Sequence, residues 1–192
     1  MSGGGGRRTI LNRAITIVLL AMALDLTGHA AVCAAGPATA APRDRIVLQT
    51  ERIDSTHWEV IVWLDNHQML AAMTLPFRWG HGHSPFMIDS ASYNGLRTEY
   101  FALKTFFPDS AGHTVLIGLI SDLGAGLPPL EPGSGPIARL CFTSRTPTSR
   151  PLLLDTTFIT PHNTLQIVTP DVRAITPEFD SGIRDAVKPP RH

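Results

Sequence analysis

Cysteine is scarce in this chain: its 192 residues include two, Cys33 and Cys141. Cys33 lies in a segment that we expect to be removed during export, which leaves Cys141 without an internal disulfide partner. Cys141 stands between Leu140 and Phe142 in an apolar run, where a cysteine packs as a small hydrophobic residue. We therefore expect neither a disulfide framework nor a cysteine nucleophile.

An excess of charge of either sign is also missing. Lys and Arg together number 16, as do Asp and Glu, so the formal net charge is zero. A chain without a basic surface lacks the electrostatic signature of nucleic-acid binding or of attachment to an acidic membrane. We expect no nucleic-acid partner.

Residues with the spacing of a catalytic site are not found in the sequence. Ser134 lies in a Gly-Ser-Gly run that Pro136 follows directly, which is not the nucleophile elbow of hydrolases. His81 and His83, two residues apart, are the candidate metal ligands, and another histidine, His67 or His113, could join them. A metal-dependent hydrolase built on His81 and His83 is one alternative; an exposed polar loop is the favoured interpretation, and no cofactor is expected.

Residues 1–40 have the pattern of an export signal. A basic start is followed by an apolar stretch, 14–24, that is too short to span a bilayer, and Ala38-Thr39-Ala40 offers a cleavage site before Ala41. The general secretory route is favoured, and the pair Arg7-Arg8 leaves a twin-arginine signal open. We expect a secreted, periplasmic or cell-surface protein, with no transmembrane anchor in the mature chain.

Proline and glycine, 16 of each, favour turns over long helices in the rest of the chain. Short apolar runs alternate with polar residues, most clearly at 57–65, where Trp58, Val60, Val62 and Leu64 share one face. A helix competes with a strand at 69–73, because Ala and Met favour helices. The expected strands are 45–51, 57–65, 68–79, 86–90, 100–107, 113–120, 136–143, 151–159, 164–169 and 171–179.

This pattern predicts an all-β fold, a two-sheet jelly-roll β-sandwich of roughly eight to ten strands with no long helix after the signal segment. The sandwich is expected to span 41–179 and to be followed by a disordered tail, 180–192.

Four segments resemble the cohesin-like domains of secreted bacterial proteins. They are the strand at 58–66 that ends in an Asn, the apolar strand at 70–77, the strand at 115–120, and the Gly-rich turn and strand Gly133-Ser-Gly-Pro-Ile-Ala-Arg-Leu-Cys-Phe-Thr143. The resemblance implies a non-catalytic module that binds a dockerin-type protein through a sheet face. The chain has no dockerin calcium loop of its own.

The function predicted from the sequence is therefore an exported binding module for a dockerin-like partner protein. The alternative is a carbohydrate-binding module that recognises polysaccharide by stacking sugars on Trp63, Trp79 and Tyr93. Against it stands the interpretation that Trp58 and Trp63 cover opposite faces of one buried strand. A structural role in an envelope assembly is a further possibility.

Overall fold

The computed structural model describes residues 43–80 and 84–182, and within these ranges the chain forms strands and turns but no α-helix. The eleven strands are β1 (Arg45–Arg52), β2 (His57–Asn66), β3 (Ala72–Trp79), β4 (Phe86–Ser92), β5 (Leu103–Asp109), β6 (Thr114–Ile120), β7 (Gly133–Ser144), β8 (Leu154–Thr156), β9 (Gln166–Val168), β10 (Ala174–Ile175) and β11 (Glu178–Asp180). The predicted all-β class is confirmed. One strand more than the predicted range is present because 171–179 divides into β10 and β11.

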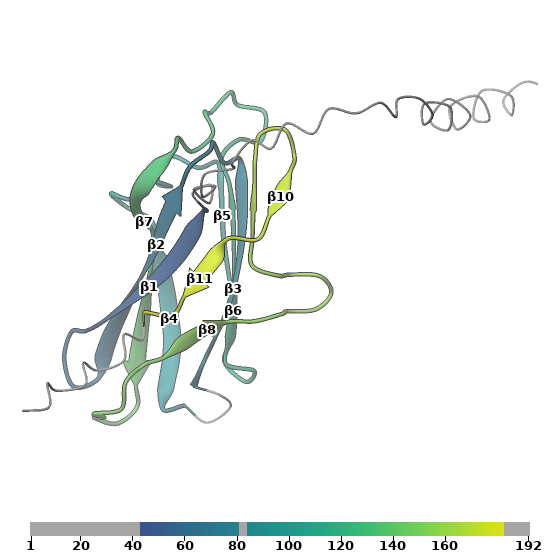
Figure 1. Ribbon diagram of the computed structural model, residues 1–192. Helices are drawn as coiled ribbons and strands as arrows, with labels where there is room; N and C mark the ends of the chain where they lie inside the picture. The colour runs from purple at the N-terminus through teal and green to yellow at the C-terminus, as the bar shows by residue number, and fades with distance from the viewer. Residues whose placement is uncertain (1–42, 81–83, 183–192) are drawn as a thin grey trace, which may run out of the picture. The chain divides into compact units, whose positions relative to one another are not determined.

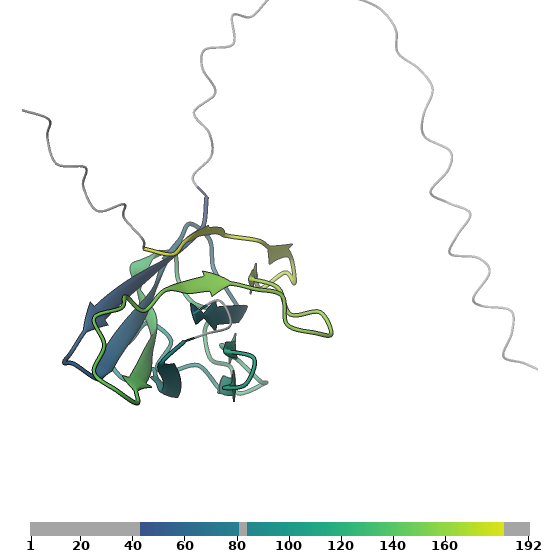
Figure 2. The same cartoon turned by 90° about the horizontal axis from the view of Figure 1, so that it is seen from below.

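Two sheets pack face to face (Figures 1 and 2). The first sheet has the order β11-β1-β2-β7-β4, and the second has the order β10-β9-β3-β6-β5, with β8 also paired to β3. Most pairs are antiparallel; β1 and β11 are parallel. The predicted two-sheet sandwich is therefore confirmed.

Alternation along β2 produces one wall of the core. Trp58, Val60, Val62 and Leu64 are buried, as predicted, while the residues between them face outward and are partly accessible. From the second sheet, Met73, Leu75 and Phe77 meet them, also as predicted. Aromatic side chains lock the two layers together through edge-to-face contacts, such as Trp79 with Phe142 at 5.5 Å between ring centroids.

The third strand is shorter than predicted. Residues 68–71 precede it as a connection, in which Leu70 is buried and forms a bridge to Leu130, whereas Met69 is exposed. The predicted inward face holds from Met73 onward. It fails at Met69 because the chain crosses between the sheets here, and strand alternation no longer applies.

The strand predicted at 100–107 begins later, at Leu103. Before it the backbone turns, with Glu99 N donating to Leu96 O and Phe101 N donating to Thr98 O, at 3.0 and 3.1 Å. Thr98 is fully buried and its hydroxyl donates to Ile137 O. This tertiary contact, rather than local propensity, holds the turn.

The sandwich closes where its two ends meet. β11 pairs with the start of β1, Glu178 N donates to Asp44 O at 2.9 Å, and Arg45 forms an ion pair with Asp180. Strand β11 thus continues one residue beyond the predicted limit at 179. The predicted export signal (1–40), His81, His83 and the tail from 183 lie outside the described residues. Within the described ranges, no helix is long and apolar enough to cross a membrane.

Candidate functional site

The outer surface of the second sheet is rich in apolar side chains. On β6, Val115, Ile117 and Leu119 point into the core and are fully buried, so the alternate residues point outward. Register with β5 and β3 sets their neighbours. We call the resulting surface the β5–β6–β3 face; its residues are Leu103, Thr105, Phe107, Leu116, Gly118, Ile120, Ala72, Thr74 and Pro76.

Two apolar rows cross this face. One joins the exposed Phe107 and the half-buried Leu116 to Pro76, which is itself buried, through direct cross-strand pairs. The other consists of three half-buried residues, Leu103, Ile120 and Ala72. The rows lie four residues apart along β6, about 13 Å at the rise of a strand. Phe107 is 62% exposed, an unusual position for a phenylalanine that no described residue covers.

Between the rows lies a strip without large side chains. Gly118 is at its centre, and Thr105 Oγ1 accepts a hydrogen bond from Gly118 N at 3.0 Å and donates to Gly118 O at 3.2 Å. A Cβ atom at Gly118 would lie 2.6 Å from Thr105 Oγ1, so the glycine is required for this close approach. The strip therefore consists of small residues flanked by two apolar rows.

A polar row borders the face at the far end of these strands. Asp109 pairs with Thr114, which pairs with Arg78, and Arg78 forms an ion pair with Asp155 of β8 at 3.6 Å. Apolar residues bordered by polar ones are common on protein-binding surfaces. In the described ranges, no group of three or more His, Cys, Asp and Glu side chains could hold a metal ion. The apolar rows and the polar row beside them therefore make the β5–β6–β3 face suitable for contact with another protein.

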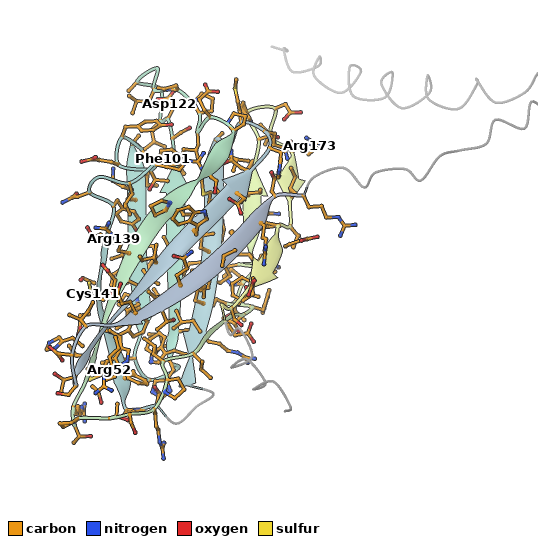
Figure 3. The ribbon with its side chains drawn as sticks, turned by 60° about the vertical axis from the view of Figure 1, so that its left-hand side comes forward. Arg52, Phe101, Asp122, Arg139, Cys141 and Arg173 are labelled. Carbon is orange, nitrogen blue, oxygen red and sulfur yellow. The ribbon has the colours of Figure 1, made fainter. Side chains whose placement is uncertain are left out.

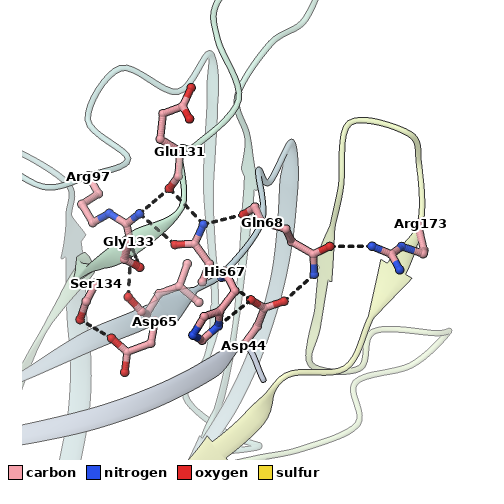
Figure 4. Close-up of polar contacts among 11 residues, drawn as sticks. Asp44, Asp65, His67, Gln68, Arg97, Glu131, Gly133, Ser134 and Arg173 are labelled. Carbon is pink, nitrogen blue, oxygen red and sulfur yellow. Dashed lines mark hydrogen bonds and ion pairs between the residues drawn. The ribbon is translucent and has the colours of Figure 1, made fainter. Parts of the chain in front are cut away.

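A second polar cluster lies at the end of the sandwich where β2 ends and β7 begins (Figure 4). The Arg97 guanidinium donates to Leu64 O, Gly133 O, Glu131 O and Asn66 Oδ1, at 2.7–3.2 Å. Burial lowers the pKa of Arg97 below its ordinary value. Both terminal nitrogens of Arg97 thus donate to carbonyl or amide oxygens, which connect the end of β2 with the turn that begins β7.

The cluster also explains the Gly-rich turn that begins β7. A Cβ atom at Gly135 would lie 2.7 Å from Arg97 Cδ, so only glycine leaves room for the arginine stem. Gly133 has a φ of 151°, a backbone conformation that residues with a side chain rarely adopt, so this position also favours glycine. The paired glycines were visible in the sequence, but Arg97, some 36 residues earlier, carried no signal that linked it to them.

The cluster extends to the start of the sandwich through Asp44. This buried carboxylate accepts hydrogen bonds from His67 N and Gln68 Nε2, both at 2.7 Å. Gln68 Oε1 in turn accepts one from Arg173 at 2.6 Å. The loops at this end are thus connected from 44 to 173 by side-chain hydrogen bonds.

The three aromatic residues predicted to stack sugars do not share a surface. Trp79 is 1% exposed and its Nε1 donates to Phe86 O at 3.0 Å, because its position in β3 has the same inward orientation as Phe77. Tyr93 is half-buried against the core, and burial raises its pKa to about 12. Trp63 lies instead on the outer face of the first sheet. The prediction that these three residues together form a surface for stacking sugars is therefore wrong.

The described histidines do not converge either. His67 follows β2 and precedes β3, whereas His113 O accepts a hydrogen bond from Trp79 N at the other end of β3. The eight residues of β3 separate these two ends by about 26 Å. His67 and His113 therefore cannot both belong to one metal site.

Cys141 lies on the outer face of the first sheet, opposite Glu59 of β2 and near Arg139 (Figure 3). It is half-buried and unpaired as a thiol among the described residues. Cys141 was expected to pack as a small hydrophobic residue; the inward positions of β7 next to it belong to Leu140 and Phe142, so it packs only in part, on the outer face.

Similarity to known proteins is found in structure but not in sequence. Neither a protein-family model nor a curated protein sequence matches the chain. Among solved structures, a non-cellulosomal cohesin from the hyperthermophilic archaeon Archaeoglobus fulgidus aligns at a TM-score of 0.52 and 13% identity, over 72% of this chain and 87% of that one.

Two cohesin–dockerin complexes also align over 72% of this chain. A novel type I complex from Clostridium thermocellum matches at a TM-score of 0.56 and 10% identity, over 95% of that chain. The sixth cohesin of scaffoldin B from Acetivibrio cellulolyticus, in complex with a Cel5 dockerin mutant, matches at 0.56 and 12%, over 94%. Together with the sheet order, these alignments show that the chain has a cohesin-like β-sandwich fold.

Proposed function

We propose that this chain is an exported, non-catalytic protein-binding module that recognises a dockerin-type partner through the β5–β6–β3 face. The observation that carries the proposal is the pair of apolar rows on that face, in which Phe107 on the edge strand β5 is 62% exposed. The solved cohesins that share its fold include ones in complex with dockerins, which supports the choice of partner.

The face offers what a folded partner needs. Two apolar rows on a rigid, hydrogen-bonded sheet present their side chains without further ordering, which keeps the entropic cost of association low. Between the rows, Thr105, Gly118 and Thr74 carry no large side chain, so side chains of the partner can contact this strip from between the rows. At one end of these strands, Asp109 and the Arg78–Asp155 ion pair form a polar border that can fix the orientation of the partner on the face.

The test is titration calorimetry of the unit Ala41–His192 against a panel of dockerin domains. Phe107→Asp is the informative variant, because it places a charge in an apolar row at a position too exposed to matter for folding. Ile53→Asp is its matched control: Ile53 is 59% exposed, close to the value for Phe107, but lies in the turn after β1 in the other sheet.

We expect saturable binding to at least one dockerin, with a Kd in the micromolar range or below. Phe107→Asp should weaken it at least thirtyfold, whereas Ile53→Asp should leave it within about twofold of the unsubstituted protein. Absence of binding across the panel would contradict the proposed partner. Binding that Phe107→Asp leaves intact would move the contact away from the β5–β6–β3 face.

A further inference from the structure

The outer face of the first sheet carries a groove that the protein-binding face does not use. It has a volume of about 500 Å³ and runs along β1, between β2 and the segment after β11. This volume is within the range of small-molecule binding sites, about 300 to 1,000 Å³. Its lining residues are Arg45, Val47, Leu48, Gln49, Thr50, Trp63, Asp65, Asp180 and Gly182.

Trp63 provides the apolar part of the groove. Its indole lies on the outer face of β2, opposite Val47 of β1, and is half-buried. Its Nε1 is directed to the other side, where it donates to Ser134 Oγ of β7 at 2.8 Å. Because this hydrogen bond fixes the ring, a ligand that packs against it does not have to order the side chain.

Polar groups surround the indole. Asp65 Oδ1 accepts hydrogen bonds from Ser134 Oγ and, at 3.4 Å, from Trp63 Nε1, which leaves Oδ2 available among the described contacts. The exposed Gln49 amide makes no hydrogen bond within the described residues. Arg45, held by its ion pair with Asp180, adds guanidinium N–H donors. The groove thus presents an acceptor, an amide that both donates and accepts, and a cation.

We propose that this groove binds a neutral oligosaccharide. A sugar ring has an apolar C–H face, which packs on an indole, and hydroxyl groups at its edge, which donate and accept hydrogen bonds at the same time. Asp65, Gln49 and Arg45 supply both kinds of partner beside Trp63. Among the described residues that line the groove, the charged groups are the carboxylates of Asp65 and Asp180 and the guanidinium of Arg45, which disfavours an acidic sugar, so the proposed ligand is a neutral one.

Tryptophan fluorescence gives a direct readout. Of the three tryptophans in the chain, Trp58 and Trp79 are 4% and 1% exposed, so quenching by acrylamide reports mainly on Trp63. The probes are cellohexaose and maltohexaose as neutral hexamers and hexagalacturonate as an acidic one, each added to the unit Ala41–His192. We expect a neutral hexamer to lower the acrylamide quenching constant at least twofold in a saturable manner.

Two variants test the site without relying on one fold-sensitive position. Trp63→Ala should abolish binding of that hexamer in calorimetry, and the exposed Gln49→Ala should weaken it about three- to tenfold, the worth of one hydrogen bond. Phe107→Asp, on the opposite sheet, is the control and should leave sugar binding unchanged. This control also separates the two proposals, because each can fail while the other holds.

Three results would overturn the oligosaccharide proposal. The first is no saturable change with either neutral hexamer. The second is equal or tighter binding of hexagalacturonate. The third comes from a truncated chain, because Gly182 lines the groove and ten residues follow it in the sequence. A chain that ends at Gly182 should be quenched like the longer one, and a large rise in quenching would identify residues 183–192 as the occupant instead.

Discussion

At the scale of single residues, Arg97 does more for stability than any motif visible in the sequence suggests. Its guanidinium supplies hydrogen bonds to Asn66, which is 3% exposed, and to carbonyl groups of the turn before and at the start of β7. We predict that Arg97→Ala lowers the free energy of unfolding by about 2 to 4 kcal/mol, because two acceptors of buried residues, Asn66 Oδ1 and Leu64 O, lose their donor. Denaturant unfolding followed by circular dichroism measures the change.

A matched arginine makes this prediction specific. Arg139 forms a partly exposed ion pair with Glu59 at 3.8 Å on the outer face of the first sheet, and Arg139→Ala should cost no more than about 0.5 kcal/mol. Arg97→Lys should fall close to Arg97→Ala, since one ammonium group cannot replace a guanidinium fork with four acceptors. If Arg97→Ala and Arg139→Ala lowered the free energy of unfolding by similar amounts, the hydrogen bonds of Arg97 would not contribute specially to stability.

The tyrosines provide a prediction about alkaline pH. Burial raises the pKa of Tyr93 to about 12 and also raises that of Tyr100, so both should ionise above pH 10 in the folded protein. The unfolded chain ionises near 10, and the resulting stabilisation is present below pH 10 and is lost as pH rises from 10 towards 12. Absorbance at 295 nm follows the titration, and Tyr93→Phe should remove the later of its two steps. Ionisation of Tyr93 near pH 10 in the folded protein would show that its hydroxyl is not buried.

The sequence predicts the orientation of a side chain where strand alternation determines it, and does not predict it where a contact with a distant residue determines it. The pattern of β2 correctly predicts that Trp58, Val60, Val62 and Leu64 face the core. The same alternation, continued along β3 from Phe77, places Trp79 in the core. The sequence pattern therefore argues against Trp79 as a residue that stacks sugars. The role of Arg97, by contrast, depends on Gly133 and Glu131 being brought to it by the fold, which no local pattern encodes.

At the scale of elements, β11 is a short strand with a large effect. It pairs with β1 in parallel, flanked by the ion pairs Arg43–Glu178 and Arg45–Asp180, and it carries Phe179, which packs against Phe77 at 6.2 Å between ring centroids. We predict that a chain ending at Pro177 is less stable by roughly 2 kcal/mol or more than one ending at Gly182, because it loses a half-buried Phe and exposes the edge of β1.

Thermal unfolding of the two truncated chains checks this, and the comparison with the chain ending at His192 isolates the contribution of residues 183–192. We expect the chain ending at Gly182 to match the longer one within about 2 °C, and the chain ending at Pro177 to melt well below both. Equal melting temperatures for all three would mean that the sandwich is complete without β11.

Element boundaries were less predictable than element types. Strands β1, β2 and β6 begin and end within one residue of their predicted limits, because turn residues border clear apolar alternation. The predicted strand at 151–159 contracts to the three residues of β8, since pairing with β3 is available only opposite Phe77, Arg78 and Trp79. Pairing partners far away in the chain set these limits.

At the scale of the whole molecule, the two outer surfaces have different chemistry although one alternation rule produces both. The second sheet presents apolar rows around Gly118, and the first presents Trp63 among Asp65, Gln49 and Arg45. The resemblance to cohesins, carried mainly by the Gly133–Thr143 segment, correctly indicated the sandwich. It could not indicate the groove beside β1, because that depends on the return of the chain as β11.

The separation of these surfaces leads to a prediction that rests on both proposals. The sheets lie about 10 Å apart across a close-packed core, and no side chain belongs to both the β5–β6–β3 face and the groove. A protein partner and an oligosaccharide should therefore bind at the same time, each with a Kd within about twofold of its value alone. Calorimetric titration of one ligand with the other at saturation measures this coupling.

Independence is expected because coupling between sites requires an element with two arrangements that both ligands bias. The strands between the two surfaces are held by backbone ladders, from β1 through β2 to β7, with one register shift between Val62 and Trp63, and from β3 through β6 to β5. The inward side chains of β2 and β6, in the middle of these ladders, are buried. A sheet fixed in this way has no second arrangement to populate. A change in Kd of fivefold or more would show that the sandwich shifts as a unit, and the β1–β11 edge, the shortest pairing beside the groove, is where such a shift would begin.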